Sequence, residues 1–167
     1  IRVGTGPEVG GELALEETTI AEGFKANGYR TGVFGKWHNG EQYPFTPTGQ
    51  GFDEAFGFNN GHWNNYFDPV LLRGSKPEQT RGYISDVLTD EAVKFLTANQ
   101  AKPFFCYLSY NAPHSPFQVP DKYFDKFKEE GFDDTLAAFY GMCENIDDNV
   151  GRLLGHLESL GLADDTI

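Results

Sequence analysis

Cationic side chains are scarce in this sequence of 167 residues. It has 13 lysines and arginines against 25 aspartates and glutamates, which leaves a formal net charge of −12. A phosphate backbone or an anionic membrane surface requires a basic face, so this charge balance argues against nucleic acid as a partner. An anionic substrate would need a local pocket of positive charge within the negative field of the whole chain.

Long apolar runs and cysteines are also in short supply. No apolar run approaches the roughly 18 residues that cross a bilayer, so we expect no membrane span. No signal peptide is recognisable, although the sequence opens without an initiating methionine. Cys106 lies in the apolar run FFCYLSY and Cys143 on an expected helix. We therefore interpret the two cysteines as buried thiols rather than as a disulfide or a catalytic thiol.

Apolar residues are sufficient for a sizeable core, at 39% of the sequence, and they recur in alternating helical and strand patterns. Thr19 and Glu22 have the spacing of a capping box, and Gly28 stands where a helix commonly ends. The pattern predicts helices over 18–27, 85–99 and 134–160, strands over 29–35 and 104–110, and a loop-rich stretch over 36–82. In the second helix we expect Ser85 as the N-cap. One face of that helix is expected to carry Leu88, Ala92, Phe95 and Leu96.

The alternation of helix and strand is typical of an α/β sandwich with a largely parallel central sheet. The near-continuous apolar run over 104–110 favours a strand that is buried on both faces. The last helix is expected to bury an apolar face, which consists of Leu136, Phe139, Cys143, Ile146, Val150, Leu153, Leu157 and Leu160.

Basic side chains follow the two expected strands at the points where they end. Lys36 and His38 follow the first strand directly, and His114 follows the second. Because open α/β sheets bind ligands beyond the carboxyl ends of their strands, we expect these side chains at one rim. Lysine suits an anionic oxygen, and histidine gives or takes a proton near neutral pH. The alternative is that all three are loop residues with structural hydrogen bonds.

Four segments resemble the sulfatase family in order and spacing. They are GYRTGVFGKWHNG, GFDEAFGF, NAPHSPF and FYGMCENIDDNVGRLLGHLESLGLADDTI, and they are distributed over most of the chain, from residue 28 to residue 167. The resemblance implies the alkaline-phosphatase-like α/β fold and hydrolysis of a sulfate ester by a formylglycine nucleophile beside a calcium ion. It also implies that residues 1–167 are a partial catalytic domain.

The resemblance assigns roles to three matching positions. Lys36 would bind a sulfate oxygen and help to hold the nucleophile. His38 would contact the formylglycine hydroxyl and assist release of the sulfate. His114 would lie at the bridging oxygen as general acid for the leaving alcohol, where a positioned proton donor helps. Asn39 stands where the family often has Leu, and either adds a polar group near the site or caps a turn.

The family's nucleophile and metal ligands have no counterpart in this sequence. Neither cysteine has the family's nucleophile context, so calcium and formylglycine are expected only in a full-length enzyme. We interpret the acidic pairs as helix caps or solvated charges and assign no metal ligand among them; they are Asp133–Asp134, Asp147–Asp148 and Asp164–Asp165. The polypeptide 1–167 alone is expected to be inactive.

A loop rich in asparagine and aromatic residues, FNNGHWNNYFDPVLLRG, suggests a sugar site. His62, Trp63 and Asn64 are the candidate substrate-binding residues, because aromatic rings stack on sugars and amides bind hydroxyls. The alternative is an ordered loop that uses asparagine for turns and Trp63 as an anchor. Trp37, between Lys36 and His38, is expected to point inward and orient both neighbours.

Three functions are consistent with the sequence. The first is a sulfuric ester hydrolase acting on a sulfated sugar or an aryl sulfate. The second is a phosphate or phosphonate ester hydrolase of the same superfamily, and the third a non-catalytic carbohydrate-binding remnant. The resemblance, the sugar-like loop and the absence of N-x-S/T sequons favour an exported, periplasmic protein.

Overall fold

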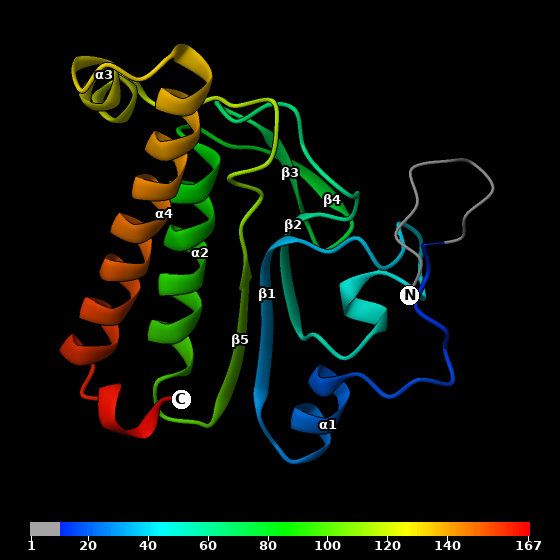
Figure 1. Ribbon diagram of the computed structural model, residues 1–167. Helices are drawn as coiled ribbons and strands as arrows, with labels where there is room; N and C mark the ends of the chain where they lie inside the picture. Colours follow the sequence, from blue (N-terminus) through cyan, green and yellow to red (C-terminus); the bar gives the residue numbers. More distant parts are fainter. Residues whose placement is uncertain (1–10) are drawn as a thin grey trace.

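A five-stranded sheet forms the centre of the structure, a computed structural model that describes residues 11–167 (Figure 1). The strands lie in the order β4-β3-β2-β1-β5. β1 runs parallel to both β2 and β5, whereas β3 and β4 pair antiparallel. The carboxyl ends of three strands therefore meet at one edge. The strands are β1 (Arg30–Lys36), β2 (Glu54–Phe58), β3 (Val70–Arg73), β4 (Lys76–Gln79) and β5 (Phe104–Ser109).

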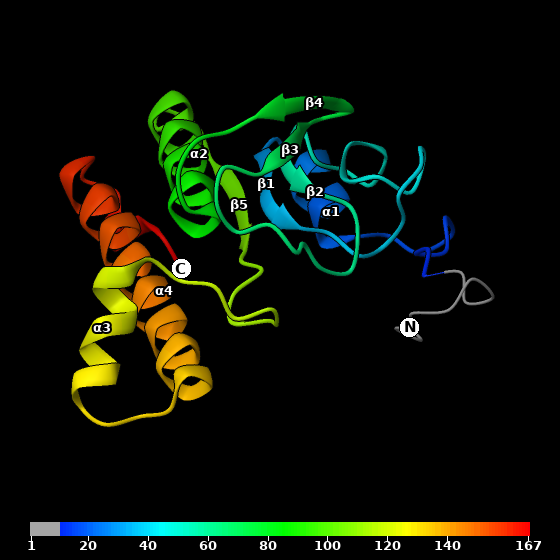
Figure 2. The same cartoon turned by 90° about the horizontal axis from the view of Figure 1, so that it is seen from above.

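Helices cover both faces of this sheet (Figures 1 and 2). α2 (Ile84–Asn99) packs against β1 and β5, and α4 (Asp134–Ser159) packs against α2. α1 (Ile20–Ala26) covers the opposite face, and α3 (Asp121–Glu129) lies against α4. Short 3-10 turns occur at Pro47–Gly49 and Ala163–Asp165. None of the described helices is both long and apolar enough to cross a membrane.

Alternation along β1 divides the core between the two faces. Phe34 belongs to the large cluster under α2, together with Phe56 and Phe95. Val33 points the other way and packs with Trp37 in a small cluster beside α1. The sheet is thus a layer between a thick helical side and a thin one.

The predicted helix ends are confirmed where local hydrogen bonding decides them. The Thr19 hydroxyl accepts from the Glu22 N–H, and the Glu22 carboxylate accepts from the Thr19 N–H, which completes the capping box. Gly28 follows with a φ of 84°, a conformation that glycine adopts without strain. Leu88 and Ala92 are fully buried on the predicted face of α2.

Three predictions about elements were wrong. The stretch 36–82 contains β2, β3 and β4, which are short and held by pairing with neighbours rather than by a strong pattern of their own. Ser85 is not an N-cap, because α2 begins one residue earlier and the Ser85 hydroxyl is buried. β5 is not buried on both faces: it is an edge strand within the described residues, and Tyr107 is 44% exposed.

The inward face of α4 also differs from the predicted one. Leu136 and Val150 are exposed, whereas Met142, Asn145 and Asn149 are buried. Both asparagine amides donate to a carboxylate oxygen of Asp86 on α2, at 2.9 and 2.7 Å. Apolar periodicity cannot reveal such a face, because polar side chains enter a core only when their partners are present.

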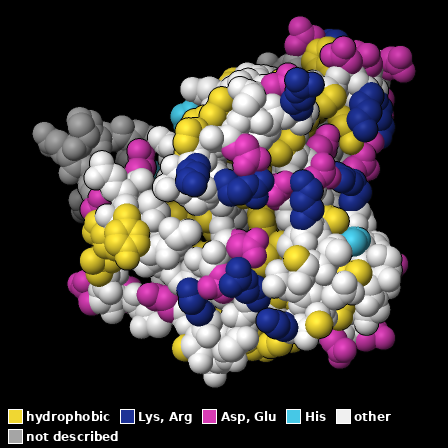
Figure 3. Space-filling model, turned by 180° about the vertical axis from the view of Figure 1, so that it is seen from behind, with side chains coloured by type: hydrophobic (Ala, Val, Ile, Leu, Met, Phe, Trp, Pro, Cys, Tyr) yellow, Lys and Arg dark blue, Asp and Glu magenta, His cyan; other side chains and the backbone are white. Residues whose placement is uncertain are grey.

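Basic and acidic side chains lie side by side on the back of the molecule, where blue and magenta alternate in Figure 3. Arg73 pairs with Glu78 and Glu91, and Lys126 pairs with Glu144. This face is therefore a mixed network of both signs rather than a basic patch.

Candidate active site

The ends of β1, β2 and β5 bring the predicted basic residues to one edge of the sheet. Lys36 is the last residue of β1 and lies opposite Phe58, the last residue of β2. Gly35 lies opposite Ser109, where β5 ends. Three segments leave this edge: the residues after Lys36, the 59–69 loop between β2 and β3, and the 110–120 loop between β5 and α3.

Gly35 permits the close approach of β1 and β5 beside the site. Its φ is +122°, and a Cβ added there would lie 1.9 Å from the carbonyl oxygen of Ser109. A side chain at this position would therefore push the two strand ends apart, and Lys36 with them.

Trp37 points into the core, as predicted, whereas its effect on the orientation of Lys36 and His38 stays a prediction. Trp37 is 8% exposed, and its Nε1 donates to the carbonyl oxygen of Phe45 at 2.8 Å. The backbone N–H groups of Trp37 and His38 donate to Phe58 and Asn59, each at 3.0 Å. Pairing with the β2 chain thus continues past the end of β1, and it fixes the backbone of His38, whose φ is 60°.

Hydrogen bonds join the 59–69 and 110–120 loops into one unit. The Asn111 amide accepts from the Trp63 N–H at 3.3 Å and donates to the Trp63 carbonyl at 2.9 Å. The Gln118 side chain accepts from the Tyr66 N–H at 3.3 Å, and the Tyr66 hydroxyl donates to the carbonyl of His114 at 2.5 Å. The backbone at His114 is therefore held by a buried tyrosine.

The ring of His114 has a defined orientation. Its Nδ1 lies 2.6 Å from the carbonyl oxygen of Ser115. Because a carbonyl oxygen only accepts, Nδ1 carries a proton, and Nε2 is the nitrogen left to exchange one with a ligand. His62 stacks on the same ring, with centroids 4.9 Å apart and planes 10° apart.

His38 reaches this group through Gly61. A Cβ added at Gly61 would lie 2.6 Å from Nε2 of His38, so the ring of His38 rests against the 59–69 loop. The structure thus gathers His38, His62 and His114 beside the end of β1, where Lys36 stands. No ion pair of Lys36 is found with the described residues 11–167. Sequence reasoning identified the basic residues but not the stacking, the Asn111 bridge or the need for Gly61.

The candidate sugar loop is more anchored than its composition suggests. Trp63 is half-buried, and its ring stacks on Phe58 with centroids 5.6 Å apart, which agrees with the anchoring alternative. His62 and Asn64 are exposed, and Nε2 of His62 lies 2.9 Å from Oδ1 of Asn64. Binding of a sugar by these three residues stays a prediction. Asn39 donates to the carbonyl of Trp37 at 2.9 Å and so closes a turn.

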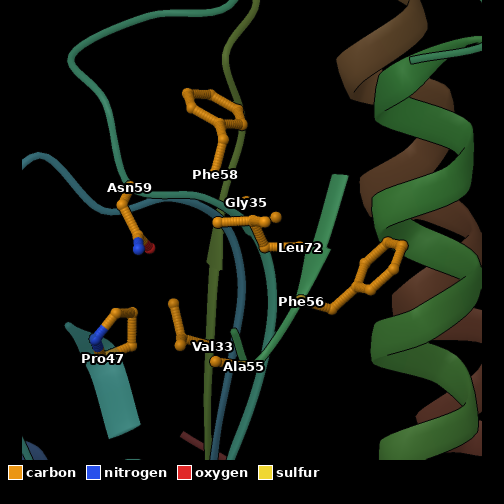
Figure 4. A pocket seen from close by; sticks show the side chains of 10 residues that line it. Val33, Gly35, Pro47, Ala55, Phe56, Phe58, Asn59 and Leu72 are labelled. Carbon is orange, nitrogen blue, oxygen red and sulfur yellow. The ribbon is translucent and has the colours of Figure 1, made fainter. Parts of the chain in front are cut away.

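A small hollow lies on the α1 side of the sheet (Figure 4). Val33 and Ala55 form its floor, with Pro47 and Asn59 beside them, whereas Phe56 and Phe58 point away from it. No charged side chain lines it, so this hollow does not suit an anion. The basic edge is the better candidate.

Neither a calcium site nor a nucleophile fits the described residues. Residues 11–167 contain no group of three His, Cys, Asp or Glu side chains that could hold a metal. Burial raises the pKa of Cys106, in the middle of β5, to about 12, and burial also raises the pKa of Cys143 on α4. Both cysteines are free and only partly buried. Asp133 caps α4 by accepting from the Leu136 N–H, as expected.

Basic side chains beyond the carboxyl ends of parallel strands make this edge the candidate ligand site of an α/β protein. The family model Sulfatase matches residues 2–167 of this chain. The chain belongs to the sulfatase family, and its α/β fold is the alkaline-phosphatase-like fold that the sequence predicted.

Relatives of known sequence agree with this assignment. Uncharacterized sulfatase YdeN of Escherichia coli K12 is 31% identical over 93% of this chain and 32% of its own length. Arylsulfatase of Klebsiella aerogenes is 33% identical over 74% of this chain and 31% of its own length. Rat N-acetylgalactosamine-6-sulfatase is 28% identical over 97% of this chain and 33% of its own length. The chain thus spans about a third of the length of these curated relatives.

Solved structures match the fold. The crystal structure of Ps i-CgsB in complex with k-i-k-neocarrahexaose superposes with a TM-score of 0.82 at 31% identity, over 87% of this chain and 37% of that one. Phosphonate monoester hydrolase of Agrobacterium radiobacter superposes with a TM-score of 0.62 at 19% identity, over 93% of this chain and 46% of that one. At this low identity the match indicates a shared fold and nothing about the reaction.

Proposed function

We propose that this chain supplies the basic edge of the active site of a sulfuric ester hydrolase. The observation that carries the proposal is that Lys36 and His38 stand at the carboxyl end of β1 and His114 follows the carboxyl end of β5, its parallel neighbour, in a chain of the sulfatase family. A chain of net charge −12 that concentrates basic residues at one edge is suited to an anionic group there.

Each side chain has a role that its chemistry supports. The ammonium group of Lys36 binds a sulfate oxygen and stabilises the charge that develops on it. His114 acts as general acid: when the S–O bond breaks, the electron pair stays on the bridging oxygen, which takes a proton from Nε2. His38 contacts the group that attacks sulfur.

Calcium and formylglycine belong to the proposal for the full-length protein. The described residues offer no ligand set for the ion and no cysteine at the basic edge, so both would come from outside residues 11–167. The proposed roles of Lys36 and His114 concern the sulfate oxygens and the leaving oxygen.

A sulfated carbohydrate is the proposed substrate, with an aryl sulfate as the second candidate. The rat relative is named for a sulfated N-acetylgalactosamine, and the solved relative Ps i-CgsB was crystallised with k-i-k-neocarrahexaose. The exposed Asn64, whose Oδ1 lies 2.9 Å from Nε2 of His62, is the side chain of this loop that we propose to bind sugar hydroxyls. We also propose that the protein is exported, as sulfatases of this kind typically are.

The test measures sulfate release by the full-length protein from 4-nitrophenyl sulfate and from sulfated oligosaccharides. A general acid matters most for a poor leaving group, so His114→Ala should lower kcat on sugar sulfates by about 10²–10⁴-fold and on the aryl ester much less. Lys36→Ala should impair both substrates. His156→Ala removes an imidazole near the end of α4 that bonds Thr97 on α2, and should leave turnover unchanged.

Other outcomes would point to the alternatives. Turnover of phosphate or phosphonate esters without sulfate release would replace the proposed reaction. Binding of sulfated sugars without any turnover would favour a carbohydrate-binding protein. An equal loss on both ester types in His114→Ala would contradict its role as general acid.

A further inference from the structure

We infer that the dipeptide Gly61–His62 is a positioning element that holds the rings of His38 and His114 in place. The dipeptide lies in the 59–69 loop and touches one histidine with each residue. The inference rests on the proposed function for the catalytic roles of His38 and His114. The contacts themselves do not depend on that reaction.

The contact of His62 with His114 is a parallel stack. The centroids are 4.9 Å apart and the planes differ by 10°, which is within the range of favourable aromatic pairs. Each ring is also bonded to its own loop, His62 to Asn64 at 2.9 Å and His114 to Ser115 at 2.6 Å. With one nitrogen and one face engaged, the ring of His114 cannot rotate without breaking a contact.

The contact of Gly61 with His38 is one of space. A Cβ at position 61 would lie 2.6, 2.7 and 3.0 Å from Nε2, Cε1 and Cδ2 of His38. The backbone of Gly61 is not in the left-handed region, so its conformation does not demand glycine. A side chain at this position would therefore displace the imidazole of His38, which occupies the room beside Gly61.

The dipeptide has a rigid base. Asn111 brackets the next residue, Trp63, by bonding both its N–H and its carbonyl, and the Trp63 ring packs on Phe58. This base connects the loop to the end of β2 and to the 110–120 loop at once.

The experiment compares His62→Ala, His62→Phe and Gly61→Ala in the full-length protein, with His156→Ala as the matched control. Steady-state kinetics on a sulfate ester give kcat and KM, and NMR of the substrate-free protein records the ring C–H signals of His38 and His114. Misplacement of a catalytic group by about 1 Å costs up to 10²-fold, so His62→Ala should lower kcat about 10–100-fold and change KM by less than about twofold.

The conservative variant separates stacking from other roles. His62→Phe keeps a planar ring, so it should restore most of kcat and preserve the ring-current shift of the His114 signals, which His62→Ala abolishes. Gly61→Ala should shift the His38 signals and lower kcat, although this variant replaces neither His38 nor His62. His156→Ala should change none of these quantities.

Two results would overturn the inference. A rise in KM with unchanged kcat in His62→Ala would make His62 a substrate contact. His114 signals that stay unmoved in His62→Ala would show that the rings do not stack. Failure of the proposed function would give a different result. The wild-type protein would then show no turnover, but its His114 signals would still respond to His62→Ala. That outcome would confirm the contact between the rings and remove only the catalytic roles of His38 and His114.

Discussion

Asp53, the acidic residue of the segment GFDEAFGF, binds groups from both neighbouring elements. Its carboxylate lies 2.8 Å from Nζ of Lys25 on α1 and 3.6 Å from Nη1 of Arg30 on β1. It also accepts from the Thr31 N–H at 3.2 Å. The residue thus joins α1 and β1 to the start of β2, and its place in the motif serves the fold rather than a metal.

Replacing Asp53 by Asn should destabilise the protein in a pH-dependent way. Burial alone would raise the pKa of Asp53, but hydrogen bonds from Lys25 and Thr31 and the charges of Lys25 and Arg30 outweigh it, so the pKa lies below 3.8. The stabilisation that comes from a lowered pKa is fully present above the pKa of the unfolded state. It is lost as the pH falls through the pKa of the folded state. We expect a loss of about 1.5–3 kcal/mol near neutral pH.

Urea unfolding of wild type and Asp53→Asn across a pH series measures this effect. The difference in free energy of unfolding should begin to shrink below about pH 4, because the carboxylate of the unfolded chain takes up a proton first, and it should vanish once the pH lies below the lowered pKa of the folded state. Glu54→Gln is the control, since Glu54 is half exposed and, among residues 11–167, pairs only with Arg30. A difference that stays constant with pH would contradict the proposed charge interaction.

Among the elements, α2 and α4 are joined by a buried polar contact. Asp86 on α2 accepts from the amides of Asn145 and Asn149, which are 0% and 1% exposed. Arg152 extends the network by donating to the Asn149 amide oxygen and pairing with Asp90. This network sets the register of the two helices, whereas apolar contacts alone would tolerate sliding.

Asp86→Ala should leave two buried amide donors with fewer acceptors. An unsatisfied buried donor costs about 1–3 kcal/mol, so the free energy of unfolding should fall by about 2–4 kcal/mol. Thermal and urea unfolding measure it. Asp147→Ala, which removes an exposed carboxylate from α4, should change stability by less than about 0.5 kcal/mol. Equal effects of the two variants would argue against the network.

The element pattern shows why strands differ in predictability. β1 and β5 are apolar runs between helices, and their positions follow from the sequence. β4 reads KPEQ, which has no apolar alternation, and it exists because it pairs with β3. A short polar strand is stabilised by its neighbour rather than by its own side chains, so no pattern in the sequence predicts it.

For the molecule as a whole, β5 is one of the two edge strands of the sheet within the described residues, and β4 is the other. Within residues 11–167 β5 pairs only with β1, and Tyr107 on it is 44% exposed. Apolar side chains of α4 are exposed too, among them Leu136, Val150 and Leu154. An open strand edge and apolar surface both favour association.

The polypeptide 1–167, prepared alone, should therefore self-associate as its concentration rises. Light scattering after size-exclusion chromatography measures its mass. Tyr107→Lys places a charge on the open strand and should reduce association. Tyr43→Lys makes the same change at a loop residue that is 79% exposed, and should have little effect. A mass of one chain at every concentration would contradict this prediction.

The candidate site was predictable in part. The sequence indicated that Lys36, His38 and His114 follow strand ends, and the parallel order of β1 and β5 brings those ends together. The stacking of His62 on His114 joins residues 52 positions apart and depends on the Asn111 bridge to Trp63. Such a contact has no periodic signal, because it arises only when two loops are already placed.

The sequence by itself determined the capping box of α1, the apolar strands β1 and β5, the inward direction of Trp37 and the family. These features depend on neighbours a few residues away or on motifs read along the chain. Only the tertiary structure decided which strands lie beside β1, which face of α4 is buried and which side chains touch at the basic edge. Those outcomes depend on contacts between distant segments, whose free energy no local pattern records.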